Sequence, residues 1–128
     1  GDVYKRQEAY KRIAAIQTPE DAADVLDELI DRYGDPPPSV SDLVNVSLAR
    51  VQATAVGVYE VTQKKDTLVL QVEQLDLRMI QGLLVAFNGR VVTGAGAKPY
   101  LSVTLQKEEK PLELLQSILR AMQDILKD

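Results

Sequence analysis

The chain has 128 residues, with 15 basic and 19 acidic side chains, a formal net charge of -4, and no cysteine, histidine or tryptophan. The lack of cysteine excludes a disulfide framework, thiolate catalysis and cysteine-based zinc sites, and it fits a reducing compartment. The lack of histidine removes the usual general base near neutral pH and the commonest transition-metal ligand. With 45% hydrophobic and 27% charged residues, the composition is that of one ordinary folded domain.

The net acidity argues against nucleic acid or an anionic membrane as a direct partner, because clustered lysine and arginine drive those interactions. The longest apolar stretch, Met79–Phe87, is broken by Gln81 and Gly82 and is shorter than the roughly 18 to 20 residues that a membrane span needs. The first residues are polar and lack the apolar segment of a signal peptide. We therefore expect a cytoplasmic protein that contacts neither nucleic acid nor membrane.

The start of the chain differs in character from the rest. Asp2–Gln7, with the sequence DVYKRQ, resembles the in-frame translation of a transposase mosaic-end adapter used in making sequencing libraries. The alternative is that this stretch is a native extension of the first helix. We expect residues 1–7 to be a non-native tail and residues 8–128 to form a single domain.

Helical periodicity dominates the first half of the chain. A short first helix is expected from Glu8, and its apolar positions are Tyr10, Ile13, Ala14 and Ile16. A second helix follows Thr18, an N-cap residue with a proline after it, and ends at Gly34. Its expected apolar stripe is Ala22, Leu26, Leu29, Ile30 and Tyr33. After a proline run, a third helix begins near Ser39 or Ser41 and ends at Gly57.

The second half alternates short strands with helices. Period-two patterns over 58–62 and 67–72 predict a β-hairpin, and two further strands are expected at 90–93 and 100–105. A helix capped by Asp76 separates the two strand pairs, and its expected apolar stripe is Leu77, Ile80, Leu83, Leu84 and Phe87. A long last helix begins near Pro111. This order predicts an α+β fold: three N-terminal helices, a mainly antiparallel sheet of about four strands with one intervening helix, and a long C-terminal helix.

Motifs that carry chemistry are missing from the sequence. Gly94–Gly96 has no third glycine, no phosphate-binding lysine and no helix directly after it, so a turn is expected there rather than a nucleotide loop. The serines have no histidine to activate them and no Ser-x-x-Lys or Gly-x-Ser-x-Gly spacing. No Asp-x-Asp-x-Asp-Gly calcium loop occurs. We expect no catalytic, cofactor-binding or metal-binding residues, and no enzyme activity in this chain.

The acidity is concentrated on the second helix. The segment from Thr18 to Asp35 contains seven acidic residues and one arginine, which gives it a local charge of -6. The acidic residues are Glu20, Asp21, Asp24, Asp27, Glu28, Asp31 and Asp35. Four of them, from Asp24 to Asp31, recur at helical spacing and so project from one side. Three interpretations apply: a solvated face, a docking face for a basic partner, or a paired-carboxylate active site, which lacks an accompanying substrate groove.

Several segments resemble the C-terminal domain of the bacterial transcription-repair coupling factors. They are Tyr10–Ile13 (YKRI), Glu28–Gly34 (ELIDRYG) with Pro37 and Val40–Leu43 after it, and Gly57-Val58. The central motif of that family usually reads Glu-Leu-x-Asp-Arg-Phe-Gly, and Tyr33 here replaces the common phenylalanine. The resemblance covers residues 8–128, with specific motifs only in the first half.

The resemblance implies a non-catalytic regulatory domain of a larger protein, an ATP-driven DNA translocase that acts on stalled RNA polymerase and recruits the excision-repair protein UvrA. It implies that the domain docks on the UvrB-like module of the same protein and masks the UvrA-binding surface until the polymerase is engaged. The contact residues that carry over are Glu28, Asp31 and Arg32. UvrA and RNA polymerase would be indirect partners. The alternative is a freestanding acidic adaptor that binds a basic protein.

Overall fold

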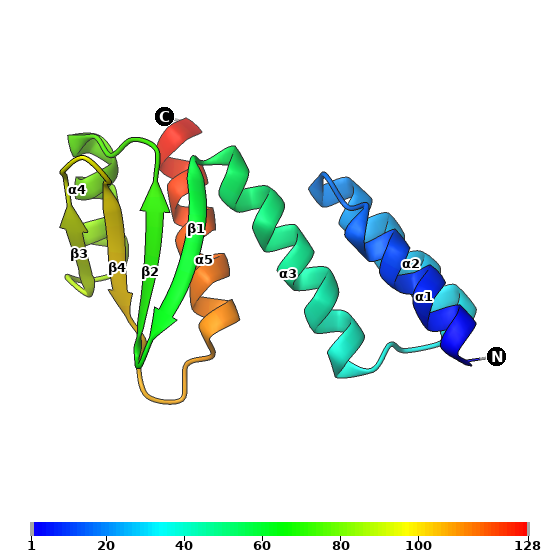
Figure 1. The fold of residues 1–128 in the computed structure, drawn as a ribbon. Helices are drawn as coiled ribbons and strands as arrows, with labels where there is room; N and C mark the ends of the chain where they lie inside the picture. The colour runs from blue at the N-terminus through cyan, green and yellow to red at the C-terminus, as the bar shows by residue number, and fades with distance from the viewer. Residues whose placement is uncertain (1, 128) are drawn as a thin grey trace. The chain divides into compact units, whose positions relative to one another are not determined.

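The computed structural model describes residues 2–127, which form five helices and one four-stranded sheet (Figure 1). The helices are α1 (Asp2–Ala14), α2 (Pro19–Tyr33), α3 (Pro38–Ala55), α4 (Leu77–Ala86) and α5 (Pro111–Lys127). The strands are β1 (Val58–Lys64), β2 (Thr67–Val72), β3 (Val91–Gly94) and β4 (Tyr100–Thr104). This order confirms the predicted α+β fold. The chain forms two compact units, one ending at Gln52 and the other beginning at Ala53.

In the N-terminal unit, α2 begins and ends where its capping residues predict. The Thr18 hydroxyl oxygen accepts a hydrogen bond of 3.0 Å from the Asp21 N–H, which satisfies one of the unpaired donors of the first turn. At the other end, Gly34 has a φ of 76° and donates its N–H to the Ile30 carbonyl at 2.8 Å. A residue with a side chain is strained at this φ, so glycine ends the helix cheaply.

The core of this unit lies where α1, α2 and α3 bury their apolar sides. Its fully buried members are Ile13, Ile16, Ala22, Val25, Leu29 and Val44. Partly buried side chains from Ala9, Val40, Leu48 and Val51 pack against them. α1 begins at Asp2 rather than at the expected Glu8, and α3 begins at Pro38, since proline is well suited to the first turn of a helix.

The predicted stripes of α1 and α2 were partly wrong. Tyr10, Ile30 and Tyr33 are 47%, 39% and 41% exposed, whereas Val25, which lies outside the predicted stripe, is buried. The side of α2 that faces the core follows Ala22, Val25 and Leu29 at spacings of three and four residues. Ile30 lies one residue, or about 100°, further round the helix, and Tyr33 is the last helical residue.

In the C-terminal unit, the strands pair in the order β1-β2-β4-β3, and every pairing is antiparallel. The hairpin of β1 and β2 confirms the prediction, and β1 extends to Lys64. The other two predicted strands differ by one residue at their ends, because β3 runs over Val91–Gly94 and β4 ends at Thr104. The register places Leu70 opposite Leu101 and Leu68 opposite Val103. These side chains share one face of the sheet and are buried, because successive residues of a strand point to opposite faces.

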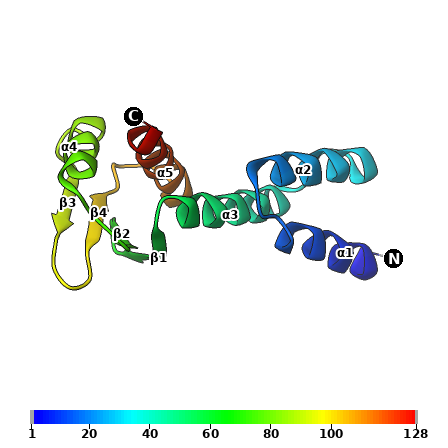
Figure 2. The same cartoon turned by 90° about the horizontal axis from the view of Figure 1, so that it is seen from above.

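The helices α4 and α5 lie on one side of this sheet (Figure 2). Their buried side chains are Met79 and Leu83 on α4, and Leu114, Ile118, Leu119 and Met122 on α5. The predicted stripe of α4 was wrong at Leu77 and Leu84, which are exposed, and Met79 faces the core instead, whereas Leu83 and Phe87 are buried as predicted. Gly82 lies where α4 meets Ile125 of α5, so the two helices approach closely at that point.

Candidate functional site

One side of α2 presents acidic side chains to solvent. Asp24, Asp27 and Asp31 are exposed, and Glu28 between them is half-buried. Their spacing of three and four residues aligns them along the helix, as the sequence indicates. The apolar side of the same helix is buried against α1 and α3, so the carboxylates of this face point away from the core of the unit.

Two arginines and two glutamates form an ion-pair network between α1 and α2. Arg12 of α1 donates from Nη1 to Oε1 of Glu28 at 2.8 Å, and its Nη2 is paired with the other carboxylate oxygen of Glu28. Arg32 lies 3.7 Å from Oε1 of Glu28, one turn away on α2. Arg32 also lies 3.7 Å from Oε1 of Glu8 on α1. The network therefore connects the two helices at the surface.

The network favours the charged form of Arg32. A hydrogen bond with the Tyr33 side chain raises the pKa of the Arg32 guanidinium, and the negative charges of Glu28 and Glu8 raise it further. The Arg32 side chain is half exposed, so solvent screens its ion pairs and added salt weakens them further. The arrangement is a cluster of exposed charges whose ion pairs depend on salt.

The predicted contact residues do not all have the same surroundings. Glu28 and Arg32 lie together in the network, with Arg12 and Glu8 as partners that sequence reasoning did not identify. Asp31 is exposed and belongs to none of the ion pairs found in the described part of the chain. The YKRI segment was noticed in the sequence and contains Arg12, but only the packing of α1 on α2 shows which carboxylate this arginine meets.

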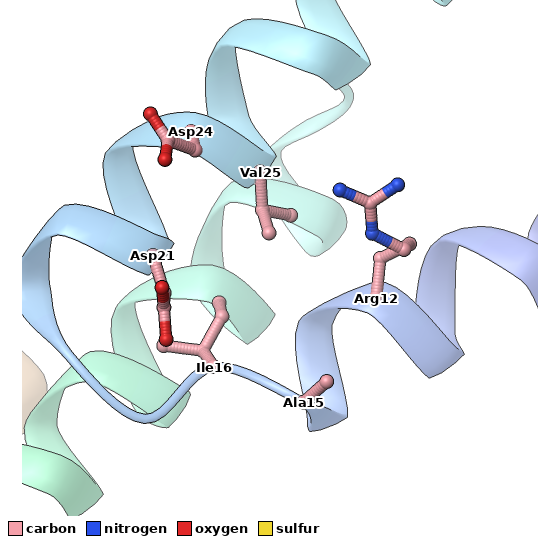
Figure 3. A pocket seen from close by; sticks show the side chains of 6 residues that line it. All are labelled: Arg12, Ala15, Ile16, Asp21, Asp24 and Val25. Carbon is pink, nitrogen blue, oxygen red and sulfur yellow. The ribbon is translucent and has the colours of Figure 1, made fainter.

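A cavity of about 230 Å³ opens between the end of α1 and the first turns of α2 (Figure 3). It is lined by Arg12, Ala15, Ile16, Asp21, Asp24 and Val25. Ile16 and Val25 are buried and supply an apolar floor. Asp21 and Asp24 stand across the cavity from Arg12 (Figure 3). The cavity adjoins the acidic face of α2, because Asp24 belongs to both.

Among residues 7–127, whose side chains the structure describes, no group of three or more metal-binding side chains comes together. None of the helices described over residues 2–127 combines the length and the apolar character that crossing a membrane requires.

Together, the fold and this site define a small α+β domain with an exposed acidic helix face. The family model of the TRCF domain matches residues 1–82, and the chain belongs to this family. Two similar proteins, each named transcription-repair-coupling factor and each from a strain of Staphylococcus epidermidis, are 27% identical over 121 residues. The match covers 91% of this chain and 10% of each relative, so the chain spans about a tenth of their length.

The structure comparison agrees with the family match. The crystal structure of a C-terminal domain of transcription-repair coupling factor is similar over 97% of this chain and 80% of the solved chain. The TM-score is 0.77 and the sequence identity is 26%. These matches confirm the resemblance that was read from the motifs of the first half, and they extend it to the fold of the second half.

Proposed function

We propose that this chain is the non-catalytic C-terminal regulatory domain of a transcription-repair coupling factor. It docks on the UvrB-like module of the same protein and masks the surface that binds UvrA until RNA polymerase is engaged. Family membership and the match to a solved C-terminal domain support the assignment. The observation that carries the docking is the exposed acidic face of α2, which suits a basic partner surface. The domain works in the cytoplasm and contacts neither nucleic acid nor membrane.

Within that face, Glu28, Asp31 and Arg32 are the proposed contacts, and they have different parts. Asp31 is exposed and offers its carboxylate directly to a cation of the partner. Glu28 is held by Arg12 at 2.8 Å, which fixes its position before docking and leaves Arg32 beside it as a donor for a partner carboxylate. A contact built from exposed charges is reversible, because each pair contributes at most about 1 kcal/mol.

The regulation is a two-state equilibrium. In the closed state the domain covers the UvrB-like module, and in the open state UvrA binds there instead. RNA polymerase shifts the populations only by the difference in its affinity for the two states. Weak docking is therefore an advantage, because a modest difference in polymerase affinity is enough to open the module.

The decisive variant is Asp31→Lys in the full-length parent protein. Loss of one ion pair and the repulsion that replaces it should raise the affinity for UvrA about fivefold, measured by titration with UvrA. Asp124→Lys is the matched control, since Asp124 is an exposed aspartate on α5 and lies outside the acidic face. Unchanged UvrA affinity in a folded Asp31→Lys protein would count against the docking. Glu28→Lys is a poorer test because it also breaks the pair with Arg12.

The alternative function is a freestanding acidic adaptor for a basic protein, which the same acidic face would serve. The reading frame upstream of this segment separates the two proposals. Helicase-type ATPase motifs there support the regulatory domain, and a complete short gene supports the adaptor. The same nucleotides test our proposal that residues 1–7 are a non-native tail, since codons unrelated to the adapter would contradict it.

A further inference from the structure

The cavity between α1 and α2 combines an apolar floor with an acidic wall. Ile16 and Val25, which form the floor, are 2% and 6% exposed. Asp21 and Asp24 stand on one side of it and Arg12 on the other (Figure 3). Ala15 contributes only a methyl group to the lining. A ligand for this site needs an apolar body and a positive end.

The charges around the cavity do not cancel. Arg12 is the cation of the lining, and its guanidinium is held by Glu28, which lies outside the lining. Asp21 accepts a hydrogen bond of 3.1 Å from the Gln17 N–H through Oδ2. The Asp24 side chain takes part in no hydrogen bond or ion pair found among the described side chains of residues 7–127. The cavity therefore has an excess of negative charge that a cation can neutralise.

The size of the cavity selects a side chain rather than a cofactor. Sites for small molecules usually have volumes of about 300 to 1,000 Å³, and this cavity, which is open to solvent, has a volume of about 230 Å³. Arginine has a long apolar stem and a flat, weakly hydrated cation that pairs well with carboxylates. The cavity offers a surface for each part of this side chain, because its floor of Ile16 and Val25 is apolar and its wall at Asp24 is acidic.

We propose that this cavity receives an arginine side chain from the basic surface on which α2 docks. The proposal rests on the proposed function, because it names the anchor of that docking contact. Asp24 and Asp31 lie on the same side of α2, so one partner surface reaches both. The exposed ion pairs along the face orient the partner as it approaches. The buried arginine stem then fixes where along α2 the partner binds.

The test uses the 128-residue chain and the probe N-acetyl-arginine amide, followed by backbone amide NMR. We expect saturable shifts around residues 15–16 and 21–25, with a dissociation constant on the order of millimolar. The matched neutral probe, N-acetyl-citrulline amide, should give none. Equal shifts with the citrulline probe, or no shifts with the arginine probe, would overturn the proposal.

Two variants distinguish binding of the probe in the cavity from its general attraction to acidic side chains. Ala15→Leu fills the cavity without changing any charge and should abolish the shifts. Asp24→Asn keeps the shape and should weaken binding about three- to fivefold. Asp27→Asn is the control, because Asp27 is exposed on the same helix and lies outside the lining. If circular dichroism shows that Ala15→Leu is folded and this variant still binds the probe, the cavity is not the binding site.

Failure of this proposal can be distinguished from failure of the docking function. Suppose that Asp31→Lys raises UvrA affinity in the full-length protein but the arginine probe binds Ala15→Leu as well as it binds wild type. The proposed arginine site in the cavity is then wrong, and the proposed docking function is still supported. If the arginine probe binds the cavity as expected but Asp31→Lys leaves UvrA affinity unchanged, the docking function is wrong and the arginine site in the cavity is still supported.

Discussion

Arg12 on α1 and Glu28 on α2 are joined by a hydrogen bond of 2.8 Å and by a second contact between the same two groups. A two-point contact of this kind fixes the relative orientation of guanidinium and carboxylate. It links the YKRI segment to the ELIDRYG motif, two segments of the chain whose association the sequence leaves unexplained. The pair serves both the fold of the N-terminal unit and the position of a proposed contact residue.

Removing this pair should cost little stability, and the cost should depend on salt. A double-mutant cycle of Arg12→Ala and Glu28→Ala, measured by chemical denaturation, should give a coupling energy of up to about 1 kcal/mol, because both side chains are partly exposed. The coupling should shrink in 1 M NaCl, since screening is then strong. Lys11→Ala on the same helix is the control. A coupling that salt leaves unchanged would contradict this account.

The C-terminal unit contains a second charged contact, with a different consequence for pH. Glu109 accepts hydrogen bonds through Oε1 from the Gln106 N–H at 2.9 Å and from Nη2 of Arg90 at 2.5 Å. These bonds, the backbone one foremost, lower the pKa of Glu109 below its ordinary value. Arg90 also donates to the Thr104 carbonyl, so the carboxylate helps to hold β3, β4 and the loop before α5 together.

Ionised Glu109 therefore stabilises the folded state. Because its pKa is lower in the folded chain, the contribution is fully present above the ordinary glutamate pKa of about 4.3 and is lost as the pH falls through the lowered value. Denaturation from pH 6 downward should show wild type more stable than Glu109→Gln at pH 6, with the difference shrinking in acid. Glu108→Gln, at an exposed neighbour, is the control. A difference that does not change with pH would contradict the prediction.

Gly82 permits the close approach of α4 and α5. A Cβ atom at this position would lie 2.5 Å from Cδ1 and 2.7 Å from Cγ1 of Ile125. Gly82→Ala should therefore not show the gain of about 1 kcal/mol that alanine brings to a helix, because overpacking costs about 1 to 3 kcal/mol. Shortening the partner in Gly82→Ala/Ile125→Ala should recover part of the loss. Additive effects of the two changes in thermal unfolding would show that the contact is unimportant.

The elements with strong local signals were predictable. Thr18 and Asp76 mark the starts of α2 and α4 because each side chain accepts a hydrogen bond from an N–H three residues on. The hairpin of β1 and β2 follows from alternation and a short loop. The central place of β2 between β1 and β4 was not predictable, because hydrogen bonds between strands far apart in sequence leave no local pattern.

The candidate site was predictable only within one helix. Glu28, Asp31 and Arg32 follow from helical spacing on α2 and from the family motif. The partners Arg12 and Glu8 come from α1, and the cavity forms only where α1 and α2 pack, so neither could be read from periodicity. The phase of the apolar stripe was the other failure, since Leu29 and Ile30 are neighbours of similar character and spacing alone does not decide which one faces the core.

That difference between Leu29 and Ile30 can be measured directly. Leu29 is 5% exposed and belongs to the core cluster, whereas Ile30 is 39% exposed. Leu29→Ala should lower the free energy of unfolding by about 2 to 5 kcal/mol, because it leaves a cavity among α1, α2 and α3. Ile30→Ala should cost less than about 1 kcal/mol, since an exposed site creates no cavity and alanine favours the helix. Equal costs, measured by urea denaturation of both variants, would mean that α2 turns a different side to the core.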